Sequence, residues 1–537
     1  MATTAAEVSH APVENLREER KVIFASSLGT VFEWYDFYIY ATLAPFFASV
    51  FFPPGNQTTA LLNSFVTYAA GFLVRPFGAL VFGRVGDLVG RKYTFLVTIV
   101  VMGMSTALVG VLPTYSSIGM LAPILLVLLR LAQGLALGGE YGGAATYVAE
   151  FSPDNKRGYN TSWIQTTATL GFFLALVVIG LCRWGMDPAD FGKWGWRIPF
   201  LLSIVLLIIS VYIRLRLQES PIFQKMKSLG KGSKAPLTES FGQWSNLKIV
   251  ILALLGATAG QGVVWYTGQF YALFFLLTTL KVDFITTYFL VGLSLVIGTP
   301  FFIVFGKLSD KIGRKWIMMA GCALAVLTYF PLFGGLTHFA NPALERFNEQ
   351  TKISLTATDC QVHIFATPLT KYSDCDRVHN QLTSRSLTYT NIEGPAGSPP
   401  TLRINDREIV GVDEPKLKAT LAELGYPAKA NGDDINKPMV LLLLVIMVIY
   451  VTMVYGPIAA YLVELFPTRI RYTSMSLPYH IGNGWFGGLL PLIATALVAA
   501  TGNIYYGLWY PIIVAAMTFI IGSLFIKETK DHKIHTI

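Results

Sequence analysis

Apolar blocks of about twenty residues recur along most of this chain of 537 residues, and they constrain its fold more than any other feature. A helix needs about twenty apolar residues to cross the hydrocarbon core of a bilayer, so each block predicts a membrane-spanning helix. Only 14% of the residues are charged, whereas a soluble domain has about 25%. We therefore expect an all-α membrane protein with twelve transmembrane helices, at 22–52, 60–82, 93–112, 118–149, 159–182, 196–216, 247–277, 284–305, 316–337, 438–463, 473–499 and 503–526.

Lysine and arginine are concentrated in alternate links between these blocks, and both termini fall on the basic side. Cytoplasmic loops of membrane proteins carry such an excess of positive charge. The net charge of +9 therefore indicates how the helices are oriented in the lipid bilayer, and it does not indicate nucleic-acid binding. We expect a multi-pass protein of the bacterial inner (plasma) membrane with cytoplasmic N- and C-termini.

Polar segments divide the chain into seven parts. They are a cytoplasmic N-terminal segment (1–21), an N-terminal six-helix half (22–217), a cytoplasmic linker (218–245), helices 7–9 of the C-terminal half (246–337), an external insertion (338–437), helices 10–12 (438–527) and a cytoplasmic tail (528–537). Strand-like runs and a short amphipathic helix favour a small α+β fold for the insertion. Its Cys360 and Cys375 share an oxidising compartment and are predicted to form a disulfide. Its sequence identifies no partner.

Two motifs occur once in each half. The pattern Gly-x-x-x-Asp-x-x-Gly-Arg-Lys begins at Gly83 and again at Gly306, and the pattern Tyr-x-x-Glu-x-x-Pro begins at Tyr147 and at Tyr461. Parallel structural repeats around a central substrate site are a common architecture of secondary transporters. The sequence therefore predicts two six-helix pseudo-repeat halves, with the insertion between helices 9 and 10.

The repeated motifs occur with Glu33-Trp-Tyr-Asp36 in helix 1, Arg75-Pro-Phe-Gly in helix 2 and Gly138-Gly-Glu-Tyr in helix 4. Together they resemble the metabolite:proton symporter family of the major facilitator superfamily, whose members carry organic acids, shikimate, proline or betaine. The resemblance implies the major facilitator fold, a monomeric protein and symport by alternating access. It also implies that the chain is not an enzyme and uses no cofactor, because the proton gradient drives transport.

The charged residues of the repeated motifs are interpreted as gating machinery. A carboxylate at the end of one helix can cap a helix N-terminus and pair with an arginine across the half. The alternative is ordinary positive charge on the cytoplasmic side with solvated partners. The gating candidates are Asp87, Arg91, Glu150 and Arg157 in the first half and Asp310, Arg314, Glu464 and Arg471 in the second.

Charged side chains inside the membrane are costly, so they are candidates for proton coupling. Four of them lie in helices 1 and 4, namely Glu33, Asp36, Arg130 and Glu140. The resemblance to proton-coupled sugar porters implies that Asp36 and Arg130 form the coupling pair, with Glu140 as a rival proton site. The alternative is a static ion pair that holds two helices together.

Arg75 is the main candidate for substrate binding, because an arginine can hold a carboxylate with two hydrogen bonds. Other polar and aromatic side chains recur at positions that can line a mostly apolar cavity. The alternative for each is an interhelical hydrogen bond. These further candidates are Tyr35, Tyr38, Gln133, Gln165, Tyr266, Gln269 and Asn483.

The motifs predict a secondary active transporter that carries a small organic acid (mono-, di- or tricarboxylate) together with protons. Two alternatives remain open: symport of a zwitterion such as proline or betaine, and a transporter-like receptor that uses the external domain. The chain has no phosphate-binding loop for ATP and no His/Cys cluster with metal-ligand spacing. The sequence does not identify the substrate, the coupling ion or the stoichiometry.

Overall fold

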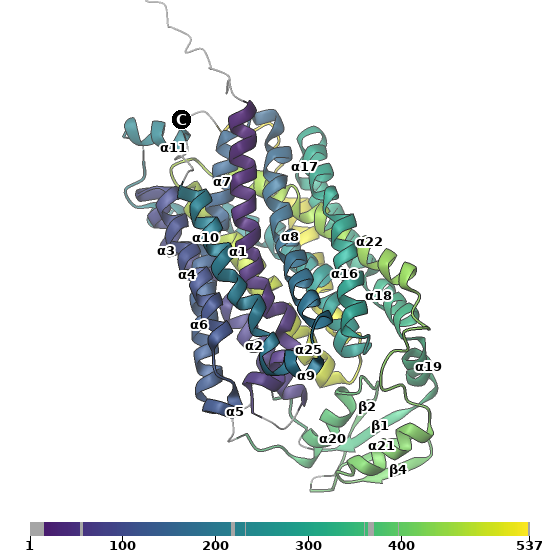
Figure 1. The fold of residues 1–537 in the computed structure, drawn as a ribbon. Helices are drawn as coiled ribbons and strands as arrows, with labels where there is room; N and C mark the ends of the chain where they lie inside the picture. The colour runs from purple at the N-terminus through teal and green to yellow at the C-terminus, as the bar shows by residue number, and fades with distance from the viewer. Residues whose placement is uncertain are drawn as a thin grey trace, which may run out of the picture.

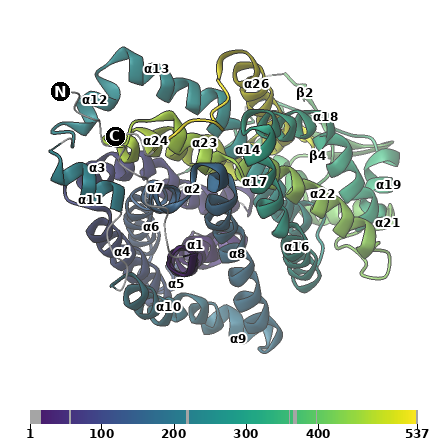
Figure 2. The ribbon, with the colours of Figure 1, turned by 90° about the horizontal axis from the view of Figure 1, so that it is seen from above.

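The computed structural model describes residues 16–53, 57–215, 221–230, 232–358, 360–363, 370–395 and 397–534. Two groups of helices run side by side along the long axis of the molecule (Figure 1). Viewed along that axis, the early and the late helices occupy opposite sides of the bundle (Figure 2). We call them the first half, from α1 to α10, and the second half, α13–α18 with α22–α26.

The first half contains α1 (Leu16–Phe51), α2 (Gln57–Leu73), α3 (Arg75–Leu88), α4 (Arg91–Val111), α5 (Tyr115–Ile118), α6 (Leu121–Gly138), α7 (Tyr141–Phe151), α8 (Arg157–Trp184), α9 (Pro188–Asp190) and α10 (Arg197–Leu215). The linker carries α11 (Pro221–Ser228) and α12 (Pro236–Phe241). The second half contains α13 (Trp244–Ala253), α14 (Ala259–Tyr266), α15 (Ala272–Phe274), α16 (Phe284–Gly298), α17 (Pro300–Ile312), α18 (Lys315–Ala340), α22 (Lys437–Tyr455), α23 (Ile458–Leu465), α24 (Arg471–His480), α25 (Leu490–Thr501) and α26 (Trp509–Phe525).

Ten helical segments of the described chain, some made of two or more helices in line, are long and apolar enough to cross a membrane. The apolar stretch Leu96–Val111 of α4 is shorter, and the 36-residue α1 runs the length of the first half (Figure 1). The chain is therefore a multi-pass membrane protein. The positions of these helices follow the predicted spans, because each apolar block is continuous in the sequence.

Several helices continue further than the sequence predicted. Gly83 and Asp87 belong to α3, and Gly306 and Asp310 belong to α17, whereas the sequence placed these motifs after the helices. The predicted spans ended where charge began. The helices continue because the Asp87 and Asp310 carboxylates bind backbone N–H groups of the opposite half instead of water.

Many membrane helices are interrupted near their middle. Pro76 follows the break between α2 and α3, and Pro457 the break between α22 and α23. Proline causes such breaks because it lacks an N–H and collides with the preceding turn. π-helical segments, which often mark functional sites, interrupt the second half at η3 (Leu254–Thr258), η4 (Thr267–Tyr271), η5 (Phe275–Thr279) and η6 (Ile481–Gly487).

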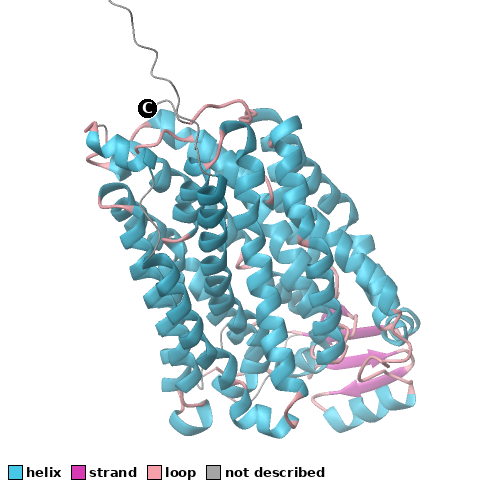
Figure 3. Cartoon of the chain, turned by 45° about the horizontal axis from the view of Figure 1, so that its top comes forward, coloured by secondary structure: helices cyan, strands magenta, loops and turns pink. Residues whose placement is uncertain are grey.

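Residues 341–436 form a small α+β unit at one end of the second half (Figure 3). Its strands, in the order β2-β1-β3-β4, pair parallel between β1 and β2 and antiparallel elsewhere. Its own apolar core includes Leu355, Leu382 and Leu402. The elements are α19 (Pro342–Gln350), β1 (Ile353–Ala357), α20 (Asp374–Thr383), β2 (Thr390–Glu393), β3 (Thr401–Ile404), β4 (Arg407–Val410) and α21 (Glu414–Glu423).

A disulfide joins Cys360 to Cys375 at the start of α20. Next to it, Asp376 closes a capping box with Ser373 and accepts hydrogen bonds from the Gln361 backbone N–H and from His363. Burial acts to raise the pKa of Asp376, but these hydrogen bonds hold it below the usual carboxyl range. The disulfide and the Asp376 carboxylate therefore tie the same short segment to α20.

The disulfide can be tested by thiol labelling. With Cys182 and Cys322 replaced by alanine, Cys360 and Cys375 are the two remaining cysteines of the four in the chain. We expect no maleimide labelling of this variant in the folded protein until a reductant is added, because both sulfurs are bonded. Labelling before reduction would contradict the disulfide.

Candidate functional site

Two sets of ion pairs cross between the halves at the end of the bundle opposite the sheet. Arg157, at the start of α8, contacts Glu464, at the end of α23, with 2.7 Å between Nη1 and Oε1. In the corresponding place, Arg471, at the start of α24, lies 3.2 Å from Glu150, at the end of α7. The sequence predicted clusters within each half. The structure corrects this prediction for Arg157 and Arg471, because each pairs with the glutamate of the other half. Arg314 pairs with carboxylates of its own half.

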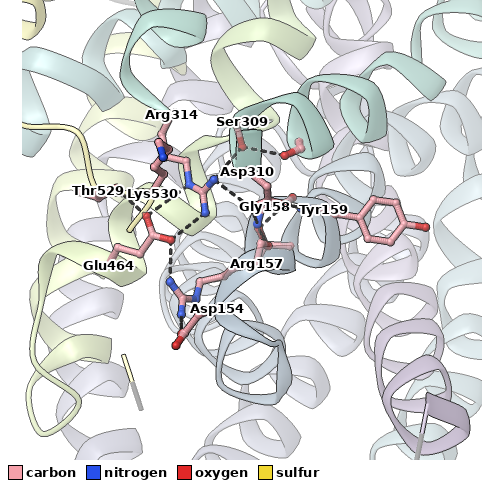
Figure 4. Close-up of polar contacts among 12 residues, drawn as sticks. Asp154, Arg157, Gly158, Tyr159, Ser309, Asp310, Arg314, Glu464, Thr529 and Lys530 are labelled. Atoms are coloured by element: carbon pink, nitrogen blue, oxygen red, sulfur yellow. Dashed lines mark hydrogen bonds and ion pairs between the residues drawn. The ribbon is translucent and has the colours of Figure 1, made fainter. Parts of the chain in front are cut away.

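Two aspartates connect the halves in the same reciprocal way. The Asp310 carboxylate, on α17, accepts hydrogen bonds of 2.8 Å from the backbone N–H groups of Gly158 and Tyr159 at the start of α8 (Figure 4). Asp87, on α3, accepts from the N–H and the hydroxyl of Thr473 at the start of α24. Each carboxylate thus caps a helix N-terminus of the opposite half, where the helix dipole favours negative charge.

Arg314 and the C-terminal tail extend the ion-pair layer. Arg314 Nη2 lies 2.9 Å from Glu464 Oε1, and Arg314 Nη1 lies 2.9 Å from Asp310 Oδ1. Glu528 accepts a hydrogen bond from the Arg314 backbone N–H. The Thr529 hydroxyl donates to Glu464 (Figure 4). The sequence did not predict these tail contacts. The side chain of Arg91, also predicted here, lies outside the described residues.

Glu33 and Glu140 share one arginine inside the first half. The Arg214 guanidinium forms ion pairs with Glu33, on α1, and with Glu140, at the break between α6 and α7. All three side chains are buried. Two ionised carboxylates beside one guanidinium would leave a net negative charge in the membrane interior, so a proton on either carboxyl neutralises the group. Arg214 lies at the end of the predicted span 196–216. Because only two residues follow it in that span, the sequence analysis counted it with the basic residues of the cytoplasmic links and not with the charges inside the membrane.

The predicted Asp36–Arg130 ion pair is not formed between these described residues. Arg130 donates to Gln133 Oε1 at 2.5 Å and lies 4.4 Å from the centroid of the Phe37 ring. Successive residues of an α-helix point about 100° apart. Since Phe37 faces Arg130, Asp36 faces elsewhere, and its Oδ1 is buried without a described hydrogen-bond partner.

Arg75 is completely buried at the break between α2 and α3. In the described part of the chain, none of its three guanidinium nitrogens has a hydrogen-bond partner. Its Cζ lies 4.2 Å from the centroid of Phe72 and 4.3 Å from that of Phe37. Tyr266 and His480 of the second half lie within electrostatic reach. A buried cation without a counter-ion is costly, so this position favours an anionic ligand group.

Aromatic side chains of both halves lie around Arg75. Tyr38 of α1 stacks on Trp265 of α14 with 5.4 Å between ring centroids, and Phe72 packs edge-on against Tyr266 at the same distance. On α7, Tyr141 stacks on Tyr479 at 3.5 Å. These pairs join opposite halves around Arg75, an arrangement that we call the enclosure, and aromatic ring faces attract cations and apolar groups.

Two predicted glutamines cross the interface at this site. Gln165 Nε2 donates to the Tyr455 carbonyl at 2.8 Å, and Gln269 Nε2 donates to the Thr169 hydroxyl at 3.1 Å. The Oε1 atom of each glutamine and the Trp265 indole N–H are buried without hydrogen-bond partners among the residues described. Polar atoms in this state can direct a bound solute.

Three predicted binding residues turn away from this enclosure. The Tyr35 hydroxyl donates to the Pro199 carbonyl within the first half. Gln133 supports Arg130, and Asn483 exchanges two hydrogen bonds with Gln261. Interhelical hydrogen bonds, the alternative considered for these residues, describe the contacts of Tyr35 and Asn483, whereas Gln133 and Arg130 lie on the same helix. The structure brings Arg75, Tyr38, Gln165, Tyr266 and Gln269 together at the interface.

Sequence reasoning did not select several aromatic members of the enclosure. Phe37 and Phe72 carry no polar atom, so nothing in their sequence distinguished them from lipid-facing residues. For Tyr141 and Tyr455, the neighbouring sequence did contain a signal that could have identified them. Tyr141 follows Glu140 in the glycine-rich motif, and Tyr455 directly precedes the Gly-Pro break of its helix.

Comparisons with known proteins agree with this architecture. Residues 21–248 and 420–537 match the family described as "Sugar (and other) transporter". The inner membrane metabolite transport protein YhjE of Escherichia coli strain K12 is 39% identical over 343 residues, which cover 61% of this chain and 75% of that protein. The alpha-ketoglutarate permease of the same organism is 36% identical over 320 residues, or 60% of this chain and 72% of the permease.

A putative proline/betaine transporter of Staphylococcus haemolyticus strain JCSC1435 is 29% identical over 506 residues, or 94% of this chain and 86% of that protein. Among solved structures, the proton:xylose symporter XylE bound to 6-bromo-6-deoxy-D-glucose aligns with a TM-score of 0.64 at 16% identity, covering 96% of this chain and 98% of that one. The fold, the repeated motifs and the family match agree. The chain is a membrane transporter, not an enzyme, and it belongs to the sugar (and other) transporter family of the major facilitator superfamily.

Proposed function

We propose that this chain carries a small zwitterion of the proline or betaine class across the membrane, together with protons. The main support for this proposal is Arg75, whose guanidinium is fully buried without a hydrogen-bond partner among the described residues. A carboxylate beside it would supply the missing counter-charge through charge-assisted hydrogen bonds. The negative faces of Trp265 and Tyr266 would suit the cationic or apolar remainder of the solute.

The similarity to a putative proline/betaine transporter along most of the chain supports this class of solute. A zwitterion needs one anion-binding and one cation-tolerant surface. Arg75 offers the first, and the rings of Phe72, Tyr266 and Trp265 offer the second. In this arrangement the carboxylate of the solute contacts Arg75, and its positive end faces the aromatic rings.

A small organic acid is the second candidate, and Arg130 favours it. The Nε and Nη2 atoms of Arg130 are also buried without partners in the described chain. The guanidinium groups of Arg75 and Arg130 lie 4.3 and 4.4 Å from the centroid of the same Phe37 ring. A solute with two carboxylates would satisfy both cations, in keeping with the similarity to an alpha-ketoglutarate permease.

We assign proton coupling to Glu33 and Glu140. These two carboxyls share Arg214, so gain or loss of one proton changes the charge of the group between neutral and negative. Such a change alters the strength of the ion pairs that join α10 to α1 and to the start of α7. Asp36 is the second candidate, because an isolated buried carboxyl is stable only when it carries a proton.

The crossed ion pairs suit a gate for alternating access. They close one end of the bundle between the halves, whereas a cavity of about 1320 Å³ lies at the other end. In our proposal the chain has twelve transmembrane helices, works as a monomer, and has the closed end and both termini in the cytoplasm of a bacterial cell. The structure then corresponds to a state that faces the outside, with the contact between Phe65 and Phe274 closed.

The test is solute accumulation in proteoliposomes that contain the full chain. Radiolabelled proline, glycine betaine, 2-oxoglutarate and citrate are offered with and without an inward proton gradient. Gradient-dependent accumulation of proline or betaine supports the proposal. Accumulation of 2-oxoglutarate or citrate alone moves the assignment to organic acids, and a lack of gradient dependence for all four contradicts proton symport.

The role of Arg75 predicts a loss of affinity on substitution. Arg75→Lys keeps the charge but loses the two-pronged geometry, so we expect the Kd for the transported solute to rise about tenfold or more. Arg183→Lys is the matched control, because Arg183 also lies over aromatic rings but at the far end of α8. An unchanged Kd for Arg75→Lys would remove Arg75 from the site.

The proton assignment predicts a separation of accumulation from exchange. In Glu33→Gln or Glu140→Gln, the shared proton site is lost, so we expect little gradient-driven accumulation while solute counterflow continues. Asp36→Asn is measured in parallel. Full accumulation by both glutamine variants, with loss in Asp36→Asn, would transfer the proton site to Asp36.

The gate assignment predicts a change in the distance between the halves. Spin labels at the exposed positions Lys156 and Lys307 report on the ion-pair end. Glu464→Gln removes one carboxylate partner from the buried Arg157 and Arg314 and breaks the ion pair between the halves. We therefore expect most of the distance distribution to move to longer values. The control is Glu239→Gln, which breaks the more exposed ion pair with Arg469. Equal distributions in both variants would contradict the gate.

A further inference from the structure

A cavity in the described chain lies at the end of the bundle opposite the crossed ion pairs. Its volume of about 1320 Å³ exceeds what one small solute fills, since small-molecule pockets are about 300–1,000 Å³. Phe46 of α1, Phe274 of α15 and Thr495 of α25 are among its lining residues. Phe274 packs against Phe65 of α2, so an aromatic contact between the halves separates this vestibule from the Arg75 enclosure.

The α+β unit supplies part of the vestibule wall. Thr383, Ser384 and Ser386, at and after the end of α20, line the cavity. This wall is fixed to the second half, because the Tyr389 N–H donates to the Gly502 carbonyl and the Ser386 hydroxyl donates to the Thr278 carbonyl. Any solute that reaches Arg75 from this end therefore passes residues of the inserted unit.

The polar lining of the vestibule is cationic. Its charged residues are Lys193 of the first half and Lys281 of the second, and no aspartate or glutamate occurs among its lining residues in the described chain. The other polar side chains are mainly hydroxyls of serine and threonine. A lysine ammonium with neighbouring hydroxyls matches a carboxylate, which accepts several hydrogen bonds.

Lys281 is held in place by the inserted unit. Its Nζ donates to the Ser384 carbonyl at 2.8 Å, and its own carbonyl accepts from the Ala430 N–H at 3.1 Å. Its backbone has φ of 56°, as has that of Ser386 on the same wall. Side-chain-bearing residues rarely adopt this conformation, which is maintained only where surrounding contacts determine it.

The ammonium of Lys281 keeps capacity for a ligand. It has three donors, and the hydrogen bond to Ser384 is the one found for it within the described residues. Burial, and then the nearby Arg385 guanidinium, lower the pKa of Lys281 to about 8. Glu414 pairs with Arg385 at 2.9 Å and offsets part of that positive charge. Lys281 is therefore charged at neutral pH and weakly hydrated, and it loses its charge as the pH rises above 8.

We propose that Lys281, positioned by the inserted unit beside Ser384 and Ser386, forms a second binding site for the carboxylate of the transported solute in the vestibule. This site rests on the proposed function, since the same solute then moves on to Arg75. The inserted unit thus takes part in solute capture. A solute held at Lys281 is concentrated next to the Phe65–Phe274 contact before the interior opens.

The test uses the full chain in proteoliposomes, with radiolabelled glycine betaine and, in a parallel series, 2-oxoglutarate as probes. We expect Lys281→Gln to raise the KM for uptake about tenfold, the loss expected for one charge-assisted hydrogen bond, with little change in kcat. Lys281→Arg retains the charge and is expected to restore the KM. Lys418→Gln, on the exposed face of α21, is the matched control.

Three outcomes decide the proposal. A raised KM in Lys281→Gln with rescue by Lys281→Arg supports the site. An unchanged KM overturns it, and a raised KM without rescue also overturns it, because Lys281 then acts only as a structural contact. The variant Arg75→Lys separates this test from the proposed function: if it retains full affinity the proposed function fails, whatever Lys281 does.

Discussion

A buried guanidinium without a counter-ion is costly in a membrane protein, and the interior of this chain is organised around Arg75 in that state. Two other buried arginines pair with carboxylates: Arg157 with Glu464, and Arg214 with Glu33 and Glu140. Arg75 instead lies among aromatic rings, at a helix break, between the two halves. In our proposal, a solute carboxylate removes the free-energy cost of burying the Arg75 guanidinium without a counter-ion. Because Arg75 lies between the halves, solute binding is then linked to their arrangement.

The internal repeat has a physical consequence at the closed end. Because the two halves carry the same motif, each half supplies carboxylates that bind groups of the other half. Arg157 pairs with Glu464, and Arg471 pairs with Glu150. Asp310 and Asp87 cap helices across the interface. All of these contacts depend on the approach of the same two surfaces. In our proposal they therefore form or break together, so that the ion-pair end acts as a two-state element rather than as a set of independent surface pairs.

Sequence reasoning located the helices, the repeat and most of the buried charges, because hydropathy and motif offsets are local properties of the chain. It could not assign partners across the halves, since a motif states which residues carry charge but not which surface they face. The Asp36–Arg130 prediction failed by one helix position: Phe37 faces Arg130, and a shift of one residue rotates a side chain by about 100°. Arg214 was misassigned because a buried arginine at a helix end has the same local sequence as a loop arginine.

The most direct test of the central claim compares a transported acid with its neutral amide. Binding of glycine betaine and of its primary amide, or of proline and prolinamide, is measured by calorimetry on the full chain in lipid nanodiscs. If a carboxylate satisfies Arg75, the acid should bind about tenfold or more tightly than the amide, and Arg75→Gln should abolish that difference. Equal binding of acid and amide to the unmodified protein would contradict a carboxylate site at Arg75.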